Sequence, residues 1–76
     1  MSQMRAPRIF QAPKILSGEI SLINHPLRYV VVASRGLGDE SLDELLTIVE
    51  VEEQRGWELV NITRTDVQYM AFIRRR

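Results

Sequence analysis

The residues that could support catalysis are few and widely spaced in this sequence. The chain has one histidine and no cysteine, which excludes disulfides, thiolate metal sites and cysteine nucleophiles. His25 lies in the loop-like stretch Asn24-His25-Pro26, and no serine has the surroundings of a positioned nucleophile. A metal site needs several converging ligands, which one histidine and scattered carboxylates do not suggest. We therefore predict a chain that is not an enzyme, with no catalytic residue, no cofactor and no metal.

A glycine pair occupies the one position typical of a phosphate-binding loop. Gly36 and Gly38 stand between a predicted strand and a predicted helix, where such loops occur. The segment lacks a third glycine and a lysine, and the acidic Asp39 and Glu40 that follow would repel an anion. A simple turn from strand to helix is the better interpretation.

The charges are sorted along the chain although they cancel overall. Ten basic and ten acidic residues give a net charge of zero, with an acidic stretch over residues 39–63 between two basic ends. Such a pattern is compatible with self-association, but an acidic helix face and basic tails in solvent are the preferred interpretation, because exposed charge pairs add little energy. The candidate sites for an anion or nucleic acid are the arginines of a basic edge: Arg28, Arg64, Arg74, Arg75 and Arg76. Tyrosines near such an edge could hold single-stranded nucleic acid, whereas the zero net charge argues against it.

The coarse elements follow from hydrophobic patterning. Three β-branched and aromatic segments, 27–34, 57–65 and 68–74, predict strands, with the third in the centre and the last two forming a hairpin. A helix is predicted from Leu42 to Arg55, beginning with a capping box of Ser41 and Glu44 and ending at Gly56 in a left-handed conformation. Its predicted apolar stripe is Leu42, Leu45, Leu46 and Val49.

Residues 1–26 are predicted to form a partly ordered N-terminal arm, and residues 27–76 the folded β-α-β-β domain. The arm contains all three prolines, and we expect it to be disordered at its tip and strand-like from Glu19 to Ile23. The predicted fold class is α+β, a three-stranded mainly antiparallel sheet with one helix on one face, to which the arm can add a short strand.

The strands are apolar on both faces, and one helix can cover only one face of such a sheet. We expect the other face to be covered by the arm, by a second subunit or by both, with a symmetric homodimer as the favoured assembly. The residues predicted to mediate self-association are Phe10, Leu22, Val32, Ile62 and Phe72. The function expected from this reasoning is that of a non-catalytic interaction or accessory protein, which leaves room for another protein partner.

The segment Gly56-Trp57-Glu58-Leu59-Val60, with RYVVVAS and SLDELL before it and MAFIRRR after it, resembles a family of small bacterial and phage domains of unknown function with this signature. The resemblance covers about residues 27–76 and implies a strand-helix-strand-strand unit without an assigned activity. The chain departs from the family pattern at Glu52, where a leucine-like residue is usual, and in its longer helix. Independently of the resemblance, we interpret Trp57 as a core residue between helix and sheet.

No segment is predicted to cross or enter a membrane. The longest apolar run, Tyr29 to Ala33, is far shorter than the ~20 residues that a spanning helix needs. No secretory signal is recognised at the N-terminus. A reducing cytoplasm is the expected location.

Overall fold

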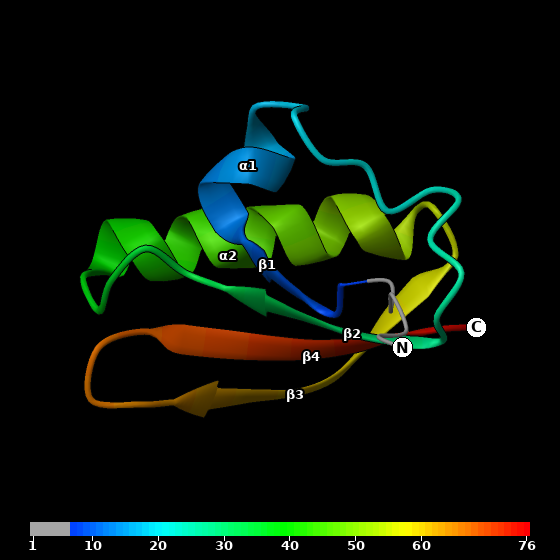
Figure 1. Ribbon diagram of the computed structural model, residues 1–76. Coiled ribbons are helices and arrows are strands. Elements are labelled where there is room, and N and C mark those ends of the chain that lie inside the picture. Colours follow the sequence, from blue (N-terminus) through cyan, green and yellow to red (C-terminus); the bar gives the residue numbers. More distant parts are fainter. Residues whose placement is uncertain (1–6) are drawn as a thin grey trace, which may run out of the picture.

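The computed structural model describes residues 7–76 and has an α+β architecture with a single four-stranded sheet (Figure 1). The elements, in chain order, are β1 (Ile9–Gln11), α1 (Ala12–Leu16), β2 (Tyr29–Ala33), α2 (Asp39–Glu53), β3 (Trp57–Arg64) and β4 (Tyr69–Arg75). The α+β class is confirmed, but the arm adds one strand and one helix to the three strands and single helix that the sequence predicts. No helix in residues 7–76 has the length and apolar character needed to cross a bilayer.

The strands lie in the order β1-β2-β4-β3, so β4 occupies the centre between β2 and β3, as predicted. Both neighbours of β4 are antiparallel to it, and β2 and β3 are therefore parallel to each other, with α2 as the connection between them. The arm strand β1 pairs in parallel with β2 and forms one edge of the sheet. The long helix α2 lies across one face of the sheet, and α1 packs beside α2 (Figure 1).

The core lies between α2 and the sheet. Its side chains come from α2, from all four strands and from the arm; the buried members are Phe10, Ala12, Leu22, Val30, Val32, Leu45, Ile48, Val49, Trp57, Ala71 and Ile73. The chain leaves α2 through Gly56, which has a φ of 98°, a conformation that is open to glycine and costly for other residues. This turn delivers Trp57 directly into the core, where its side chain is fully buried.

The helix α2 begins earlier than the sequence predicts, and the predicted capping box is wrong. The extended Gly38 is the N-cap, and the Leu42 N–H donates to the Gly38 carbonyl at 3.1 Å. Ser41 therefore lies one turn inside the helix and is buried, so its hydroxyl is not the cap. Glycine is an acceptable N-cap, and the acidic Asp39 and Glu40 in the first turn favour this start through the helix dipole.

The buried face of α2 is rotated relative to the predicted stripe. Leu45 and Val49 are buried as predicted, whereas Leu46 is 39% exposed. The face instead continues through Ile48 and Glu52, both almost fully buried. The arm explains this rotation, because α1 packs against α2 and covers a part of the helix that the sheet does not reach.

The described part of the arm shares the core with the rest of the chain. Phe10, Ala12 and Leu22 are all buried. The strand predicted over residues 19–23 is wrong, because this stretch runs as turns and irregular chain after the helix α1; the strand of the arm is β1 instead. The disorder predicted at the tip of the arm concerns residues 1–6, which lie outside the described residues.

His25 fixes the end of the arm to the rest of the fold. Its ring Nε2 lies 2.7 Å from the Pro7 carbonyl oxygen, and its Nδ1 accepts a hydrogen bond from the Leu27 N–H at 3.2 Å. With Nδ1 as the acceptor of the Leu27 N–H, Nε2 is the ring nitrogen that faces the Pro7 carbonyl as its donor. The ring also packs edge-on against Phe10 and Trp57. His25 therefore has a structural role, whereas the sequence suggested only a loop residue.

Candidate interaction surface

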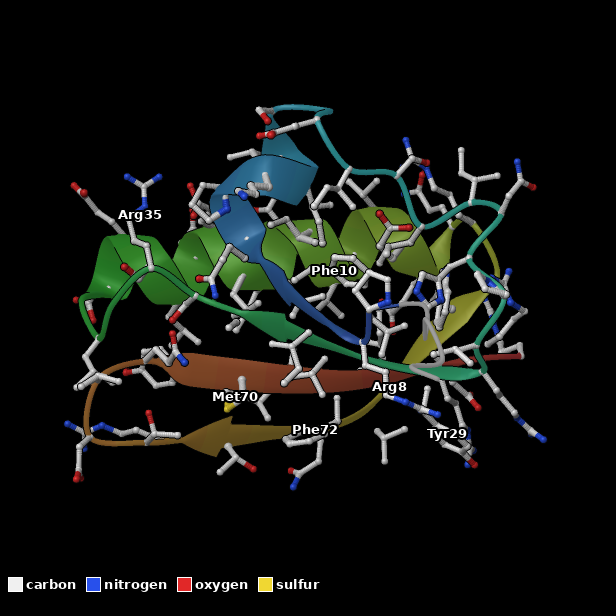
Figure 2. The ribbon with its side chains drawn as sticks, viewed as in Figure 1. Arg8, Phe10, Tyr29, Arg35, Met70 and Phe72 are labelled. Atoms are coloured by element: carbon white, nitrogen blue, oxygen red, sulfur yellow. The ribbon has the colours of Figure 1, made fainter. Side chains whose placement is uncertain are left out.

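The sheet has a second face, directed away from α2, which we call the outer face. Alternation along β2 sends the buried Val30 and Val32 toward α2 and places Tyr29 and Val31 on the opposite side. The strand register extends this alternation across the sheet. Val31 pairs with Phe72 of β4 and with Ile9 of β1, so these three side chains lie on the same face. Figure 2 shows Tyr29 and Phe72 on the side of the sheet away from α2.

The outer face is largely apolar, and every strand contributes to it. Its apolar side chains are Ile9, Tyr29, Val31, Val60, Met70 and Phe72. Ile9 is 58% exposed, Val60 52%, Tyr29 49% and Phe72 37%, while Val31 and Met70 are half-buried. A shallow hollow of about 410 Å³ lies on this face, with Arg8 and Asn61 at its margin.

A bulge in β3 shapes this face. Leu59 pairs with Ile73 and Asn61 pairs with Phe72, so Val60 is an extra residue in the ladder. The bulge reverses the alternation of β3, since one added residue moves every later side chain to the other side. Ile62 consequently packs against the core, and the outer face receives Val60 and Asn61 side by side.

The polar groups at the margin of the outer face carry both signs of charge. Arg74 and Glu58 form an ion pair at 2.5 Å, and the Glu58 carboxylate raises the pKa of the Arg74 guanidinium above its usual value. Arg8 donates a hydrogen bond to the Tyr29 carbonyl at 3.4 Å. The face is therefore an apolar centre with a mixed polar margin, which is the usual arrangement of a protein–protein interface.

The residues predicted to mediate self-association are separated by the fold. Phe10, Leu22 and Val32 are buried in the core of this chain. Ile62 is half-buried and packs against the same core. Only Phe72 of the five lies on the outer face.

The predicted arginine edge is divided between two ends of the sheet. Arg64 lies at the end of β3 beside Tyr69. The other four arginines lie toward the opposite end of the sheet: Arg28, Arg74, Arg75 and Arg76. Three of these, Arg28, Arg75 and Arg76, surround a shallow hollow beside Pro26.

Most of these arginines already have partners within the chain. The Arg75 guanidinium lies 4.5 Å from the centre of the Trp57 ring and donates to the His25 carbonyl at 2.6 Å. Arg76 donates to the Glu53 carbonyl, and Arg74 is paired with Glu58. A continuous row of free guanidinium groups is therefore not formed by the predicted residues.

The sequence pattern alone does not assign Ile9, Tyr29 and Val31 to the outer face. Alternation in the predicted strand 27–34 places Tyr29 and Val31 on one side, but the sequence does not say which side receives the helix. Ile9 belongs to a three-residue strand, which is too short for a periodic pattern. In residues 7–76, histidine, aspartate and glutamate side chains form no cluster suited to a metal ion.

Comparisons with protein-family models, with curated proteins and with solved structures find no match to this chain. The resemblance to the small domains with the Gly-Trp-Glu-Leu-Val signature therefore stays a prediction from the quoted residues.

Proposed function

We propose that this chain is a small non-catalytic interaction protein that pairs with a second copy of itself through the outer face of its sheet. The observation that carries the proposal is the set of six apolar side chains on a face that residues 7–76 leave uncovered. The sequence also predicts the arm as a possible cover for this face of the sheet. From residue 7 onward it instead forms the sheet edge, packs beside α2 and contributes to the core on that side.

The energetic reason for pairing is the burial of these side chains. Removing a valine, isoleucine or phenylalanine side chain completely from water contributes ~1.5–3 kcal/mol. Ile9, Val60 and Phe72 are each more than a third exposed, so a partner lying on the face can recover part of this free energy. A 76-residue domain has a small stability margin, which makes such burial valuable to the folded state.

A second copy fits this face better than a strongly charged partner. In a two-fold dimer the face meets itself, so a surface with one sign of charge would repel its counterpart. Here the charged margin combines Arg8 and Arg74 with Glu58, and its centre is uncharged. Sheet-to-sheet packing of two such faces buries the apolar residues while leaving the ionic groups at the solvated margin.

Sedimentation velocity at micromolar concentrations tests the proposal. We expect a dimer for the wild-type chain and a folded monomer for Phe72→Asp, because the new carboxylate would be buried unpaired at the centre of the interface. The matched control is Val67→Asp, since Val67 is 68% exposed in the turn between β3 and β4 and lies off the outer face. A wild-type monomer, or a Phe72→Asp dimer of unchanged affinity, would contradict the proposal.

The second candidate function is binding of nucleic acid or a nucleotide-like anion at the arginine-rich end of the sheet. It is favoured by the hollow that Arg28, Arg75 and Arg76 surround. It is weakened by the intramolecular partners of Arg75 and Arg76. Filter binding of single-stranded RNA and DNA at low salt tests it, and retention that Arg28→Ala reduces would support it.

A further inference from the structure

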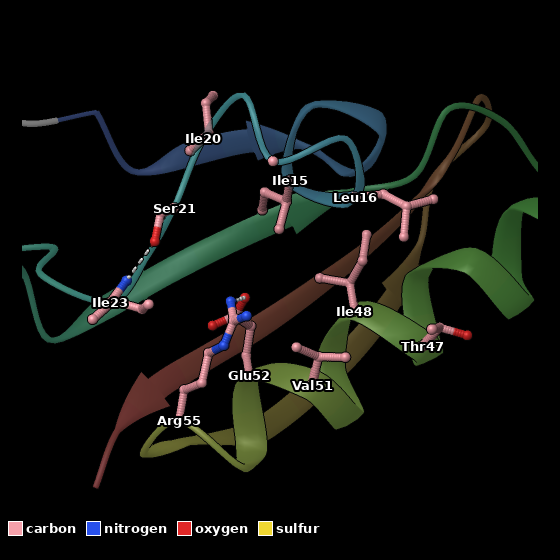
Figure 3. Close-up of a pocket in the computed structure, with 11 residues that line it drawn as sticks. Ile15, Leu16, Ile20, Ser21, Ile23, Thr47, Ile48, Val51, Glu52 and Arg55 are labelled. Atoms are coloured by element: carbon pink, nitrogen blue, oxygen red, sulfur yellow. Dashed lines mark hydrogen bonds and ion pairs between the residues drawn. The ribbon is translucent and has the colours of Figure 1, made fainter.

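A separate pocket lies on the other side of the molecule, between α2 and the arm (Figure 3). It has a volume of about 300 Å³, at the lower end of the range typical of small-molecule sites. Its walls are mostly aliphatic. The arm contributes Ile15, Leu16, Ile20 and Ile23, and α2 contributes Ile48 and Val51. Leu16 and Ile23 are both more than half exposed, so the mouth of the pocket is apolar as well.

One acidic side chain is buried in this aliphatic lining. Glu52 is only 1% exposed. Figure 3 shows its side chain extending from α2 toward the arm, with the side chain of Arg55, from the turn after α2, beside it. Its Oε2 lies 3.4 Å from an Arg55 guanidinium nitrogen, and its Oε1 has no hydrogen-bond partner in the described part of the chain. Burial raises the pKa of Glu52, and Arg55 opposes this effect.

Within the described residues the ion pair with Arg55 uses only Oε2 of this carboxyl group, and Oε1 is left without a partner. A buried acceptor without a partner lowers the stability of the folded state, and a leucine would continue the aliphatic lining without that cost. Glu52 Oε1 is a buried acceptor without a partner in the lining of an apolar pocket, and this arrangement is suited to a ligand that brings the missing donor.

We propose that this pocket binds a small uncharged amphiphile, whose short aliphatic chain lies against the isoleucines and whose hydroxyl group donates a hydrogen bond to Glu52 Oε1. The site is distinct from the outer face, and the inference does not depend on self-association.

The charges around the pocket favour an uncharged head group. Arg55 already offsets the Glu52 carboxylate, so an ammonium ligand would add a net positive charge to a largely apolar cavity. A carboxylate ligand would meet the like charge of Glu52 in the same low-dielectric surroundings. A hydroxyl group satisfies the free oxygen without either cost.

Titration of the full chain with 1-hexanol, followed by ¹H–¹⁵N correlation spectra, tests the proposal. We expect saturable shifts at the amides of Ile20, Ile48 and Val51. Methyl pentyl ether is an isomer of hexanol that has no donor, and we expect it to bind at least about tenfold more weakly, the loss of one hydrogen bond to a charged acceptor. We expect hexylamine and hexanoate to bind more weakly than hexanol.

Two variants separate the carboxyl group from the cavity. We expect Glu52→Leu to weaken hexanol binding by about tenfold or more. Glu50→Leu is the matched control, because Glu50 is exposed on the same helix and does not line the pocket. We expect this variant to bind hexanol with the affinity of the wild type. If Glu52→Leu does not fold, the comparison of hexanol with its ether in the wild-type chain still decides. Absence of saturable shifts with hexanol, equal affinity of the ether, or tighter binding of either charged probe would overturn the proposal.

Discussion

Trp57 shows how a single residue holds this small fold together. Its side chain is fully buried, with the Arg75 guanidinium over one side of the ring and His25 packed edge-on. His25, near the end of the arm, also contacts Phe10 and Pro7 near its beginning. Trp57 thus links the sheet, the C-terminal strand and the arm, as expected of a core residue.

We expect Trp57→Ala to lower the free energy of unfolding by ~3–5 kcal/mol, because it removes the largest buried side chain and leaves a cavity. In a domain of this size such a loss unfolds most of the protein. Circular dichroism and urea denaturation measure the effect. A variant that stays folded and loses only a binding activity would contradict the structural role.

The buried Glu52 makes the stability of the protein depend on pH. Burial raises its pKa above the usual 4.5 in the folded state, so the folded chain holds this proton more tightly than the unfolded chain. Stability from this group is present below the usual pKa and is lost as the pH rises through the folded-state pKa. This group therefore makes the folded protein less stable at pH 7 than it is below about pH 4.5.

Accordingly, we expect Glu52→Gln to raise the melting temperature at pH 7, with the difference from wild type shrinking below about pH 4.5. Thermal melts at pH 7 and pH 4 provide the measurement, and the exposed Glu53→Gln on the same helix is the control. A Glu52→Gln variant that is less stable than wild type at pH 7 would show that the ion pair with Arg55 outweighs the cost of burial.

Among the elements, the junction of α2 and β3 was predictable because it depends on local chemistry. Gly56 adopts the positive φ that the end of a helix commonly requires, with Trp57 directly after it. We expect Gly56→Ala to cost ~1 kcal/mol, since its Cβ meets no atom and only the backbone conformation is penalised. Gly36→Ala is the control, because its Cβ makes an ordinary 3.6 Å contact and its φ is not positive. Chemical denaturation compares the two variants, and equal losses would contradict this reason for the glycine.

The elements of the arm were not predictable from local patterns. The strand β1 has three residues and α1 has five, which is too short for hydrophobic periodicity, and both depend on contacts with β2 and α2. The alternation of Ile20, Ser21 and Leu22 suggested a strand, but within residues 7–76 no strand pairs with this stretch. The capping box failed for a related reason: Ser41 and Glu44 have suitable spacing, yet the helix starts three residues earlier at Gly38 and buries Ser41 instead.

At the scale of the whole molecule, the sequence predicted an excess of apolar strand surface, and the structure shows where it lies. The central position of β4 and the α+β class followed from the hydrophobic pattern. The identity of the outer face did not, because the bulge at Val60 moves Ile62 to the core and the arm buries Phe10 and Leu22. Four of the five residues predicted to mediate self-association therefore lie in or against the core. The sequence pattern does not contain the strand register and the arm contacts that decide on which side each residue lies.

Salt distinguishes the two candidate functions of the whole molecule. We expect the dimer dissociation constant to change by less than about threefold between 0.1 and 1 M NaCl, because the proposed contact is apolar and exposed ion pairs contribute little. Binding of nucleic acid through the arginines would weaken by orders of magnitude over the same range. Sedimentation equilibrium at both salt concentrations provides the measurement, and a dimer that dissociates in 1 M NaCl would argue against the outer face as its interface.

The bulge in β3 has a further consequence for how this protein behaves when concentrated. β3 is the longer of the two border strands, and its extra residue disturbs the regular spacing that an incoming chain would need to extend the ladder. The opposite border, β1, offers only three residues to such a chain. Both borders therefore hinder the growth of ribbons or amyloid-like fibrils by strand addition. We expect concentrated solutions of the protein to form no fibrils and to show no turbidity.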